Sequence, residues 1–198
     1  AHLESEKPAR NFPIADGEEE FMKNCFLLTV KPVIYAANIK EDDMGKDEDS
    51  LPFVVQVKEF AANEGAEVLV ICAKTEEELS QMDPDDKAVF MEEFGLGESG
   101  LDRLIKKSYA LLGLISYLTA GEKETRAWTI NEGTKAPQAA GKIHSDFEKG
   151  FIRAEIVKYD DLIALGSWNA AKEKGLMKSE GKEYVMQDGD IVEFLFNV

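Results

Sequence analysis

The sequence has no long hydrophobic run, only two cysteines and two histidines, and no excess of basic residues. No apolar stretch approaches the roughly 20 residues that a membrane-spanning helix needs. No basic segment followed by an apolar one begins the chain, so we expect neither a membrane contact nor a secretory signal. Two cysteines cannot form a disulfide framework and fit a reducing compartment, and the scattered Cys and His residues lack zinc-ligand spacing.

The charge is strongly acidic and unevenly placed. Asp and Glu number 39 against 23 Lys and Arg, a net charge of −16 that disfavours holding DNA or an anionic membrane by bulk charge. Residues 1–125 carry a net charge of −14 and residues 126–198 one of −2. The C-terminal part can therefore approach an anionic partner without strong repulsion. A hydrophobic content of 44% with eleven Phe is enough for a packed core.

The first part of the chain alternates predicted strands and helices. Residues 1–17 hold two Pro, a Gly and scattered charge, which predicts a linker. Short apolar runs at 33–37 and 67–72 predict buried strands. Helical spacing of apolar residues predicts helices over 18–28, 51–64, 75–79, 83–94 and 101–118. Strand, helix, strand, helix is the pattern of a parallel α/β sheet with crossover helices.

The pattern changes after Gly121, where we expect a second, α+β module. Strands are predicted over 125–131, 151–159, 184–186 and 191–196, with a short helix or turn over 137–141 and a helix over 160–174. We expect Asp160 to cap the longer helix and Gly175 to end it. The strand order along the chain suggests a mostly meandering sheet, and we place the domain boundary near residues 119–125.

One biased segment, residues 41–49, contains six acidic residues and one Lys. A solvated loop explains this composition. A divalent-metal loop is the alternative, but the segment lacks the alternating ligands of a calcium loop. We therefore predict no metal site.

Polar residues follow both predicted buried strands of the first part. Ligands bind at the carboxyl ends of strands in open α/β sheets. The first strand runs into Asn38-Ile39-Lys40-Glu41 and the second into Cys72-Ala73-Lys74. Asn-x-x-Asp after one strand and Ser-Ala-Lys after the next form the base-recognition pair of GTPase domains, in which the Asp accepts from guanine N1–H and the 2-amino group. Glu41 is one methylene longer, which relaxes the rejection of adenine. A loop Asn beside a surface Glu is the alternative.

Four longer segments carry a family resemblance. Phe26–Asn38 resembles the strand that leads to the altered base-recognition loop of the YchF (Obg-like ATPase) family of translation-factor-class P-loop NTPases. Leu111–Trp128 resembles that family's entry into its C-terminal TGS domain. Gly133–Glu155 and Glu180–Val198 resemble signatures within that domain. The match runs from about residue 7 to the C-terminus.

The resemblance implies a fold and a division of the chain. The fold class is α/β: the C-terminal part of a P-loop NTPase G domain, followed by an α+β β-grasp (ubiquitin-like) TGS domain. Residues 1–17 would be the linker returning from a coiled-coil arm that the chain lacks. Residues 18–121 would be the C-terminal part of the G domain, and residues 122–198 the TGS domain.

The same resemblance assigns a nucleotide site. Asn38, Ile39 and Glu41 match the base-contacting loop, and Cys72, Ala73 and Lys74 the second loop. The family typically prefers ATP to GTP, which agrees with the length of the Glu41 side chain. Cys72 replaces the usual Ser, and since a thiol is a weaker donor, the hydrogen bond of that hydroxyl is in doubt while a backbone contact at Ala73 should remain.

The sequence contains no phosphate-binding loop. Such a loop ends in Gly-Lys-Ser or Gly-Lys-Thr at a helix start, whereas Gly45-Lys46, Gly141-Lys142 and Gly181-Lys182 are followed by other residues. We therefore expect a C-terminal fragment of an ATPase that binds ATP or GTP with Mg²⁺. The fragment itself should hold no nucleotide tightly and hydrolyse neither ATP nor GTP, because the phosphoryl-transfer chemistry depends on the absent parts.

By resemblance the TGS domain contacts the ribosome or RNA, which implies a cytoplasmic protein. The alternative is a non-enzymatic module whose β-grasp sheet binds RNA or protein. A basic face and scattered solubilising charges are both open for Lys135, Lys142, His144, Lys149, Arg153, Lys158, Lys172, Lys174, Lys178 and Lys182. Base stacking and burial in the core are both open for Trp128, Phe147, Phe151, Trp168 and Tyr184. His144 is either a titrating group or a structural one.

Overall fold

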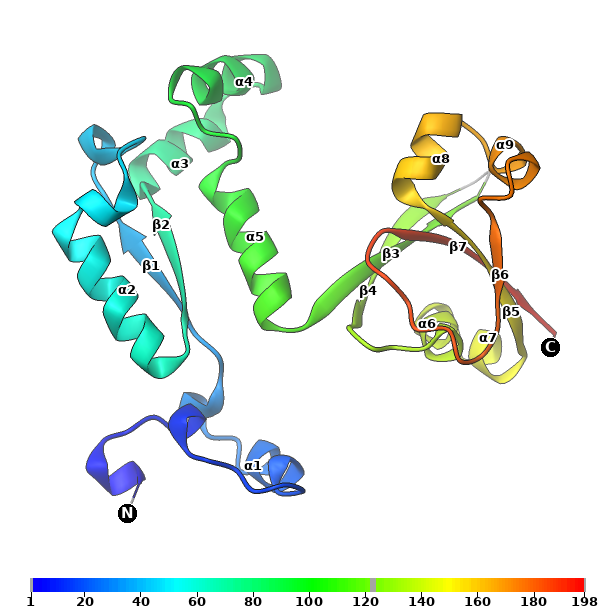
Figure 1. The fold of residues 1–198 in the computed structure, drawn as a ribbon, viewed down its shortest axis with the longest axis horizontal. Coiled ribbons are helices and arrows are strands. Elements are labelled where there is room, and N and C mark those ends of the chain that lie inside the picture. Colours follow the sequence, from blue (N-terminus) through cyan, green and yellow to red (C-terminus); the bar gives the residue numbers. More distant parts are fainter. Residues whose placement is uncertain (1, 122–123, 198) are drawn as a thin grey trace. The chain divides into compact units, whose positions relative to one another are not determined.

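The computed structural model describes residues 2–121 and 124–197, and the chain divides into two units, Ala1–Leu111 and Leu112–Val198 (Figure 1). The first unit is built around a pair of parallel strands with helices. The second is a five-stranded mixed sheet with helices. Each unit is described separately below.

The first unit contains the parallel strands that the sequence predicts. Strand β1 (Ile34–Asn38) pairs with β2 (Glu67–Ile71) in a register that runs from Ile34↔Glu67 to Asn38↔Ile71. Helix α2 (Pro52–Glu64) connects the two strands and buries Val54 and Ala61. Pro52 occupies the first turn, where its missing N–H costs nothing. The register brings the carboxyl ends of both strands to the same edge.

Four further helices complete the first unit. They are α1 (Glu19–Asn24), α3 (Ala73–Gln81), α4 (Pro84–Glu93) and α5 (Gly100–Leu111), together with short 3₁₀ turns at 3–5, 9–11, 28–30, 41–43 and 48–50. The α4 helix begins at Asp83, whose carboxylate accepts from the N–H groups of Asp85 and Asp86. The Glu76 side chain of α3 accepts from the N–H of Gly100 at 2.6 Å and so caps α5.

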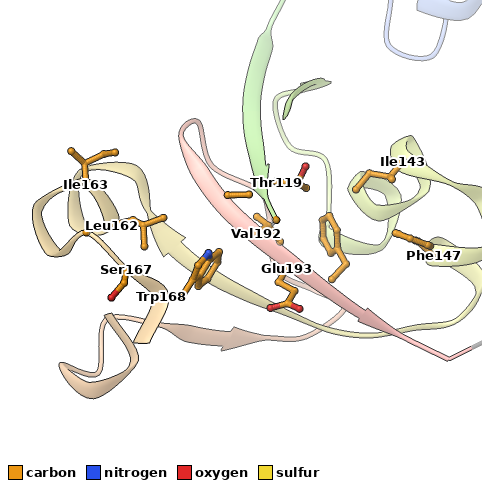
Figure 2. Close-up of a pocket in the computed structure, with 13 residues that line it drawn as sticks. Thr119, Ile143, Phe147, Leu162, Ile163, Ser167, Trp168, Val192 and Glu193 are labelled. Atoms are coloured by element: carbon orange, nitrogen blue, oxygen red, sulfur yellow. The ribbon is translucent and has the colours of Figure 1, made fainter. Parts of the chain in front are cut away.

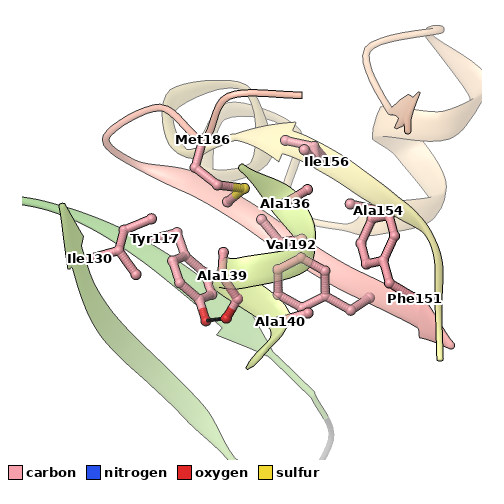
Figure 3. Close-up of a cluster of buried hydrophobic side chains, with 11 residues drawn as sticks. Tyr117, Ile130, Ala136, Ala139, Ala140, Phe151, Ala154, Ile156, Met186 and Val192 are labelled. Atoms are coloured by element: carbon pink, nitrogen blue, oxygen red, sulfur yellow. Dashed lines mark hydrogen bonds between the residues drawn. The ribbon is translucent and has the colours of Figure 1, made fainter. Parts of the chain in front are cut away.

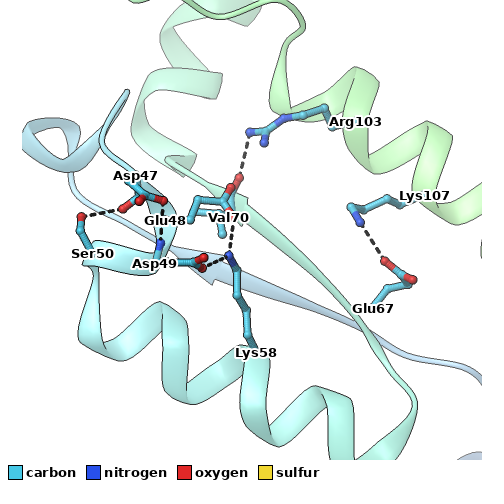
Figure 4. Close-up of polar contacts among 9 residues, drawn as sticks. All are labelled: Asp47, Glu48, Asp49, Ser50, Lys58, Glu67, Val70, Arg103 and Lys107. Atoms are coloured by element: carbon cyan, nitrogen blue, oxygen red, sulfur yellow. Dashed lines mark hydrogen bonds and ion pairs between the residues drawn. The ribbon is translucent and has the colours of Figure 1, made fainter.

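Side chains of α5 reach the strand β2 (Figure 4). The Arg103 guanidinium donates to the carbonyl of Val70 at 2.8 Å, and Lys107 pairs with Glu67 at 2.8 Å. Carbonyls on an unpaired strand edge invite pairing with other chains. Arg103 therefore satisfies one edge carbonyl of β2.

The acidic segment 41–49 forms short turns with local partners. Asp47 accepts from the N–H of Asp49, and Lys58 of α2 pairs with Glu48 at 3.0 Å and Asp49 at 2.8 Å (Figure 4). Lys46 pairs with Asp43 at 2.7 Å. Much of this negative charge is thus partnered by lysines.

Residues near the N-terminus are attached to the first unit rather than extended from it. Ala9 is 2% exposed and its N–H donates to the Thr29 hydroxyl. The Glu64 carboxylate accepts from Arg10 at 2.8 Å and from the Tyr35 hydroxyl at 2.6 Å. Part of the predicted linker thus packs against the unit.

The second unit has the strand order of a β-grasp fold. Its strands are β3 (Leu114–Ala120), β4 (Thr125–Asn131), β5 (Phe151–Lys158), β6 (Lys178–Glu180) and β7 (Asp190–Phe196). The order in the sheet is β4-β3-β7-β5-β6. The C-terminal β7 lies in the centre, parallel to β3 and antiparallel to β5.

The core of the second unit lies between the sheet and helix α6 (Ala136–Ile143) (Figure 3). Ala136, Ala139 and Ala140 are completely buried, so the helix backbone approaches the strands closely. The Tyr117 hydroxyl donates to the Ala139 carbonyl at 2.8 Å. Burial raises the pKa of Tyr117 well above its ordinary value, so the phenol stays neutral. Three short helices complete the unit: α7 (Ser145–Lys149), α8 (Tyr159–Leu165) and α9 (Trp168–Glu173).

Several sequence predictions of local structure are wrong. Asp160 does not cap a helix, because it lies in the first turn of α8, whose N-cap residue is Lys158. The helix predicted over 101–118 ends at Leu111, and residues 114–120 form β3, so the second unit begins before the predicted boundary. The helix predicted over 160–174 is two helices, separated at Gly166, whose φ of +73° ends α8. Residues 184–186 form a single bridge between Val185 and Lys135 rather than a strand. The sheet is no meander, because β7 inserts between β3 and β5.

Candidate nucleotide-base site

The candidate site lies where β1 and β2 end. Asn38 is the last residue of β1 and lies beside Ile71, the last residue of β2. The loops that follow these strands therefore meet, and they enclose a pocket of about 300 Å³. The pocket is lined by Asn38, Ile39, Lys40, Glu41, Asp42, Cys72 and Lys74. Five of the six predicted site residues line the pocket. The sixth, Ala73, is not in the lining, but its N–H donates to the side chain of Asn38.

Asn38 joins the two loops. Its side-chain oxygen accepts from the N–H of Ala73 at 2.9 Å. The N–H of Ile39 donates to the carbonyl of Ile71 at 2.9 Å and extends the strand ladder by one bond. With its oxygen accepting from Ala73, Asn38 can still offer the two donors of its amide NH₂ to a ligand.

Glu41 and Lys74 form a second link between the loops. The Lys74 ammonium lies 2.6 Å from the Glu41 carboxylate and 3.8 Å from that of Glu78. The hydrogen bond to Glu41 is the main reason that the pKa of Lys74 is raised above its ordinary value. Both side chains remain substantially exposed, so the pair is accessible from the pocket.

The Cys72 thiol is braced by a residue that the sequence analysis did not single out. Cys72 is 6% exposed, and the Thr75 hydroxyl lies 3.2 Å from its sulfur and 3.0 Å from that of Met44. The side chain at position 72 thus still contacts the helix that follows. Lys40, which lies inside the predicted motif, and Asp42, which directly follows it, also line the pocket and could have been included on the ground of their position in the sequence.

The second unit contains a larger and more apolar pocket of about 850 Å³ (Figure 2). Its lining includes Ile143 and Phe147 on one side and Leu162, Ile163 and Trp168 on the other, with Val192 and Glu193 of β7 between them. Thr119 and Ala120 at the end of β3 also line this pocket. This pocket carries no group of distinctive chemistry.

The aromatic residues proposed for base stacking mostly pack in or against the core. Phe151 is 5% exposed, and Trp128, Phe147 and Tyr184 pack against the core cluster. Phe147 is stacked on Phe196 with ring centroids 3.8 Å apart. Trp168 lines the apolar pocket.

Several of the candidate basic residues have carboxylate partners. Lys135 pairs with Glu183, Arg153 with Glu155, and Lys158 with Asp190. The His144 ring nitrogen accepts from the N–H of Asp146, so this histidine caps α7 and has a structural role. Within residues 2–121 and 124–197, no carboxylate lies within ion-pair distance of Lys142, Lys149, Lys172, Lys174, Lys178 and Lys182.

The described residues offer neither a metal-ligand cluster nor a membrane-spanning helix. No group of three or more His, Cys, Asp or Glu side chains is placed to hold a metal ion. No helix in this part of the chain is long and apolar enough to cross a membrane.

Two parallel strands whose ends carry an Asn-linked pair of loops, followed by a β-grasp unit, define an α/β protein with a candidate ligand site at the carboxyl ends of its strands. Residues 114–197 match the YchF-GTPase_C family, described as "Protein of unknown function (DUF933)". The ribosome-binding ATPase YchF of Bacillus subtilis is 53% identical over 196 residues, which is 99% of this chain and 53% of that protein. The Escherichia coli O157:H7 protein of the same name is 45% identical over the same share.

Solved structures agree with these relatives. The Schizosaccharomyces pombe YchF GTPase matches with a TM-score of 0.82 and 36% identity, over 98% of this chain and 51% of that one. A GTP-binding protein from Pyrococcus horikoshii shares the fold, with a TM-score of 0.57 and 22% identity over 84% of this chain and 46% of that one. The chain belongs to the YchF family. It spans about half the length of the curated relatives that it matches.

Proposed function

We propose that residues 38–41 and 72–74 bind the base of a nucleotide, and that the chain belongs to a cytoplasmic ATPase that prefers ATP to GTP. The hydrogen bond between Asn38 and Ala73 is the observation that carries this proposal. It ties together the ends of two adjacent parallel strands, the position at which open α/β sheets bind ligands. The names of the bacterial relatives, ribosome-binding ATPases, support the choice of ATP.

The chemistry of the pocket fits a purine. The Asn38 amide can donate to a ring nitrogen, and the Glu41 carboxylate can accept from an exocyclic amino group. A carboxylate placed for guanine accepts from both N1–H and the 2-amino group. Glu41 is one methylene longer than the Asp of that arrangement, which weakens this bidentate contact and with it the rejection of adenine.

The residues present fit the base but not the triphosphate. When bound in the longer protein, ATP with Mg²⁺ would supply the phosphoryl group for hydrolysis. This sequence contains no Gly-Lys-Ser or Gly-Lys-Thr to hold the phosphates. We therefore expect the 198-residue chain to release no phosphate from ATP or GTP, measured by a malachite-green assay beside a full-length relative. Turnover at the relative's rate would contradict the proposal that hydrolysis needs a phosphate-binding loop, which this sequence does not contain.

A nucleoside titration tests the base site without needing phosphate contacts. Addition of adenosine to the ¹⁵N-labelled chain should shift the amide signals of residues 38–41 and 72–75. Asn38→Ala should weaken this binding about tenfold, the value of one hydrogen bond that also orders the loops. Asn63→Ala, at an exposed Asn of α2, is the matched control and should leave the titration unchanged. Shifts confined to other parts of the chain would reject the site.

We further propose that residues 112–198 act as a TGS domain that contacts the ribosome or RNA. Its near-neutral charge and the lysines without carboxylate partners between Lys172 and Lys182 support this role. The relatives' printed name, ribosome-binding, agrees with it. Contacts driven by phosphates weaken as salt rises.

Co-sedimentation of the chain with ribosomes at increasing salt tests the second proposal. Binding should be strongest at low salt, and the double change Lys172→Glu and Lys174→Glu should reduce it. The same change at Lys23 and Lys31, exposed lysines of the first unit, is the matched control. Absence of binding at low salt would reject the proposal.

A further inference from the structure

The two loops of the candidate base site are held together by two side-chain links of different chemistry. The first, from Asn38 to the N–H of Ala73, is neutral. The second is the ion pair of Glu41 and Lys74 at 2.6 Å. Glu41 and Lys74 both line the pocket. A ligand in the pocket therefore meets a carboxylate whose charge is already paired.

We propose that Lys74 determines which purine this site accepts, by holding the Glu41 carboxylate so that it cannot pair with guanine. This inference rests on the proposed base-binding function. It assigns specificity to Lys74, whereas the argument from side-chain length concerned Glu41 alone.

The hydrogen-bonding groups of the pocket explain why Glu41 must discriminate. The Asn38 amide NH₂ can donate to N7, an acceptor that both purines have. Asn38 thus cannot distinguish adenine from guanine through N7. Guanine differs by its N1–H and 2-amino donors, which a free carboxylate would accept with charge-assisted bonds. Adenine has no such pair.

The Lys74 ammonium, 2.6 Å from Glu41, makes that carboxylate a weaker acceptor for guanine. Guanine would have to displace Lys74 from Glu41 or share it, and either costs part of the ion pair. Loss of the Lys74 charge would release Glu41 into the pocket and make guanine more favourable. Asp42 also lines the pocket, and its carboxylate is the alternative to Glu41 as an acceptor for the N1–H and 2-amino groups of guanine.

The test compares adenosine and guanosine affinities by NMR titration of the full 198-residue chain. Lys74→Met keeps the aliphatic part of the side chain and removes its charge. We expect the affinity for guanosine relative to adenosine to rise about tenfold, the value of one charge-assisted hydrogen bond. Lys74→Arg should retain the wild-type ratio. The Lys74 side chain is 65% exposed, so these variants should keep the wild-type melting temperature.

Two controls isolate the route through Glu41. Glu78→Gln removes the more distant carboxylate, 3.8 Å from Lys74, and should leave the ratio unchanged. In a Glu41→Gln background, Lys74→Met should have no further effect on the ratio, because there is no carboxylate left to release. Such a double-mutant cycle separates an action through Glu41 from a general change in charge.

Three outcomes would overturn the role proposed for Lys74. An unchanged ratio in Lys74→Met, with adenosine still bound by the wild type, would overturn the role of Lys74 and leave the proposed function intact. If Asp42→Asn, and not Glu41→Gln, abolished the effect of Lys74→Met on the ratio, Asp42 would be the carboxylate that accepts from guanine and the inference would be overturned. Failure of the wild type to bind either nucleoside would overturn both proposals together.

Discussion

At the scale of single residues, Glu64 joins three separate segments. It accepts from Arg10 and from the Tyr35 hydroxyl, and these two hydrogen bonds lower its pKa below the ordinary value of 4.5. A carboxyl with a lowered folded-state pKa stabilises the fold above its unfolded-state pKa, and this contribution disappears as the pH falls through the folded-state value.

Glu64→Gln should therefore lower the melting temperature of the first unit at pH 7. The difference from the wild type should shrink as the pH falls below about 4.5, where the carboxyl of the unfolded chain takes up its proton, and should disappear below the lower folded-state pKa. Thermal unfolding followed by circular dichroism between pH 7 and pH 3 measures this. Glu59→Gln, at an exposed position of the same helix, is the control. A difference that does not depend on pH would contradict the assignment.

Asp190 is the fully buried carboxylate of the second unit. It accepts from Lys158 at 2.6 Å, the Tyr184 hydroxyl at 2.9 Å and the N–H of Gln187 at 2.9 Å. Burial, and then the bond to Asp190, raise the pKa of Tyr184. Asp190→Asn keeps the shape but points amide hydrogens at these donors, and should destabilise the unit by about 3 kcal/mol. Urea unfolding measures it. Asp160→Asn, at an exposed position, should change stability little.

At the scale of elements, the close approach of Gly150 to the end of β7 restricts one position. A Cβ at Gly150 would lie 1.9 Å from the carbonyl oxygen of Asn197. The N–H of Asn197 donates to the carbonyl of Gly150 at 2.9 Å, so the two backbones cannot separate without losing this bond. Gly150→Ala should destabilise the second unit by about 1–3 kcal/mol, measured by urea unfolding. Gly181→Ala, where no atom lies within 4 Å, should be neutral.

Local sequence signals predicted the elements of the first unit best. The run at 33–37 and the Pro52-to-Gly65 segment became β1 and α2, as their apolar residues and end signals predict. Their burial was predicted less well, because no residue of β1 is fully buried and Phe53 and Phe60 of α2 are exposed. The same reasoning failed at 111–118, where apolar residues suit both a helix and a strand. Pairing with β4 along all of residues 114–120 decides for the strand, and such pairing is invisible to local spacing.

The site was predictable to the extent that chain order determines it. Asn38, Glu41 and Lys74 follow two strands that had to be neighbours, so the sequence indicated that their loops would meet. The side-chain links could not be predicted in the same way. That Ala73 donates to Asn38, and that Thr75 contacts the sulfur of Met44, depends on the relative placement of segments distant in sequence.

At the scale of the whole molecule, the two units should unfold in separate transitions. The only two tryptophans, Trp128 and Trp168, lie in the second unit, so tryptophan fluorescence reports that unit alone. Circular dichroism reports both. The two probes should give non-coincident urea transitions, which excludes two-state unfolding of the whole chain.

The residue-scale variants provide the internal check. Asp190→Asn should shift the fluorescence transition, whereas Glu64→Gln should shift only the part of the dichroism transition that fluorescence does not follow. Coincident transitions that both variants move equally would show that the chain unfolds as one cooperative body.

The three completely buried alanines of α6 have a consequence for divergence within this fold. Their methyl groups set how near the helix backbone comes to the strands, and a larger side chain at Ala136, Ala139 or Ala140 would push the helix outward. Substitutions on the outer face of that helix are therefore tolerated, whereas the inner face accepts only the smallest side chains. Homologues too distant for overall identity to reveal should still display this spacing of small residues ahead of a buried Phe.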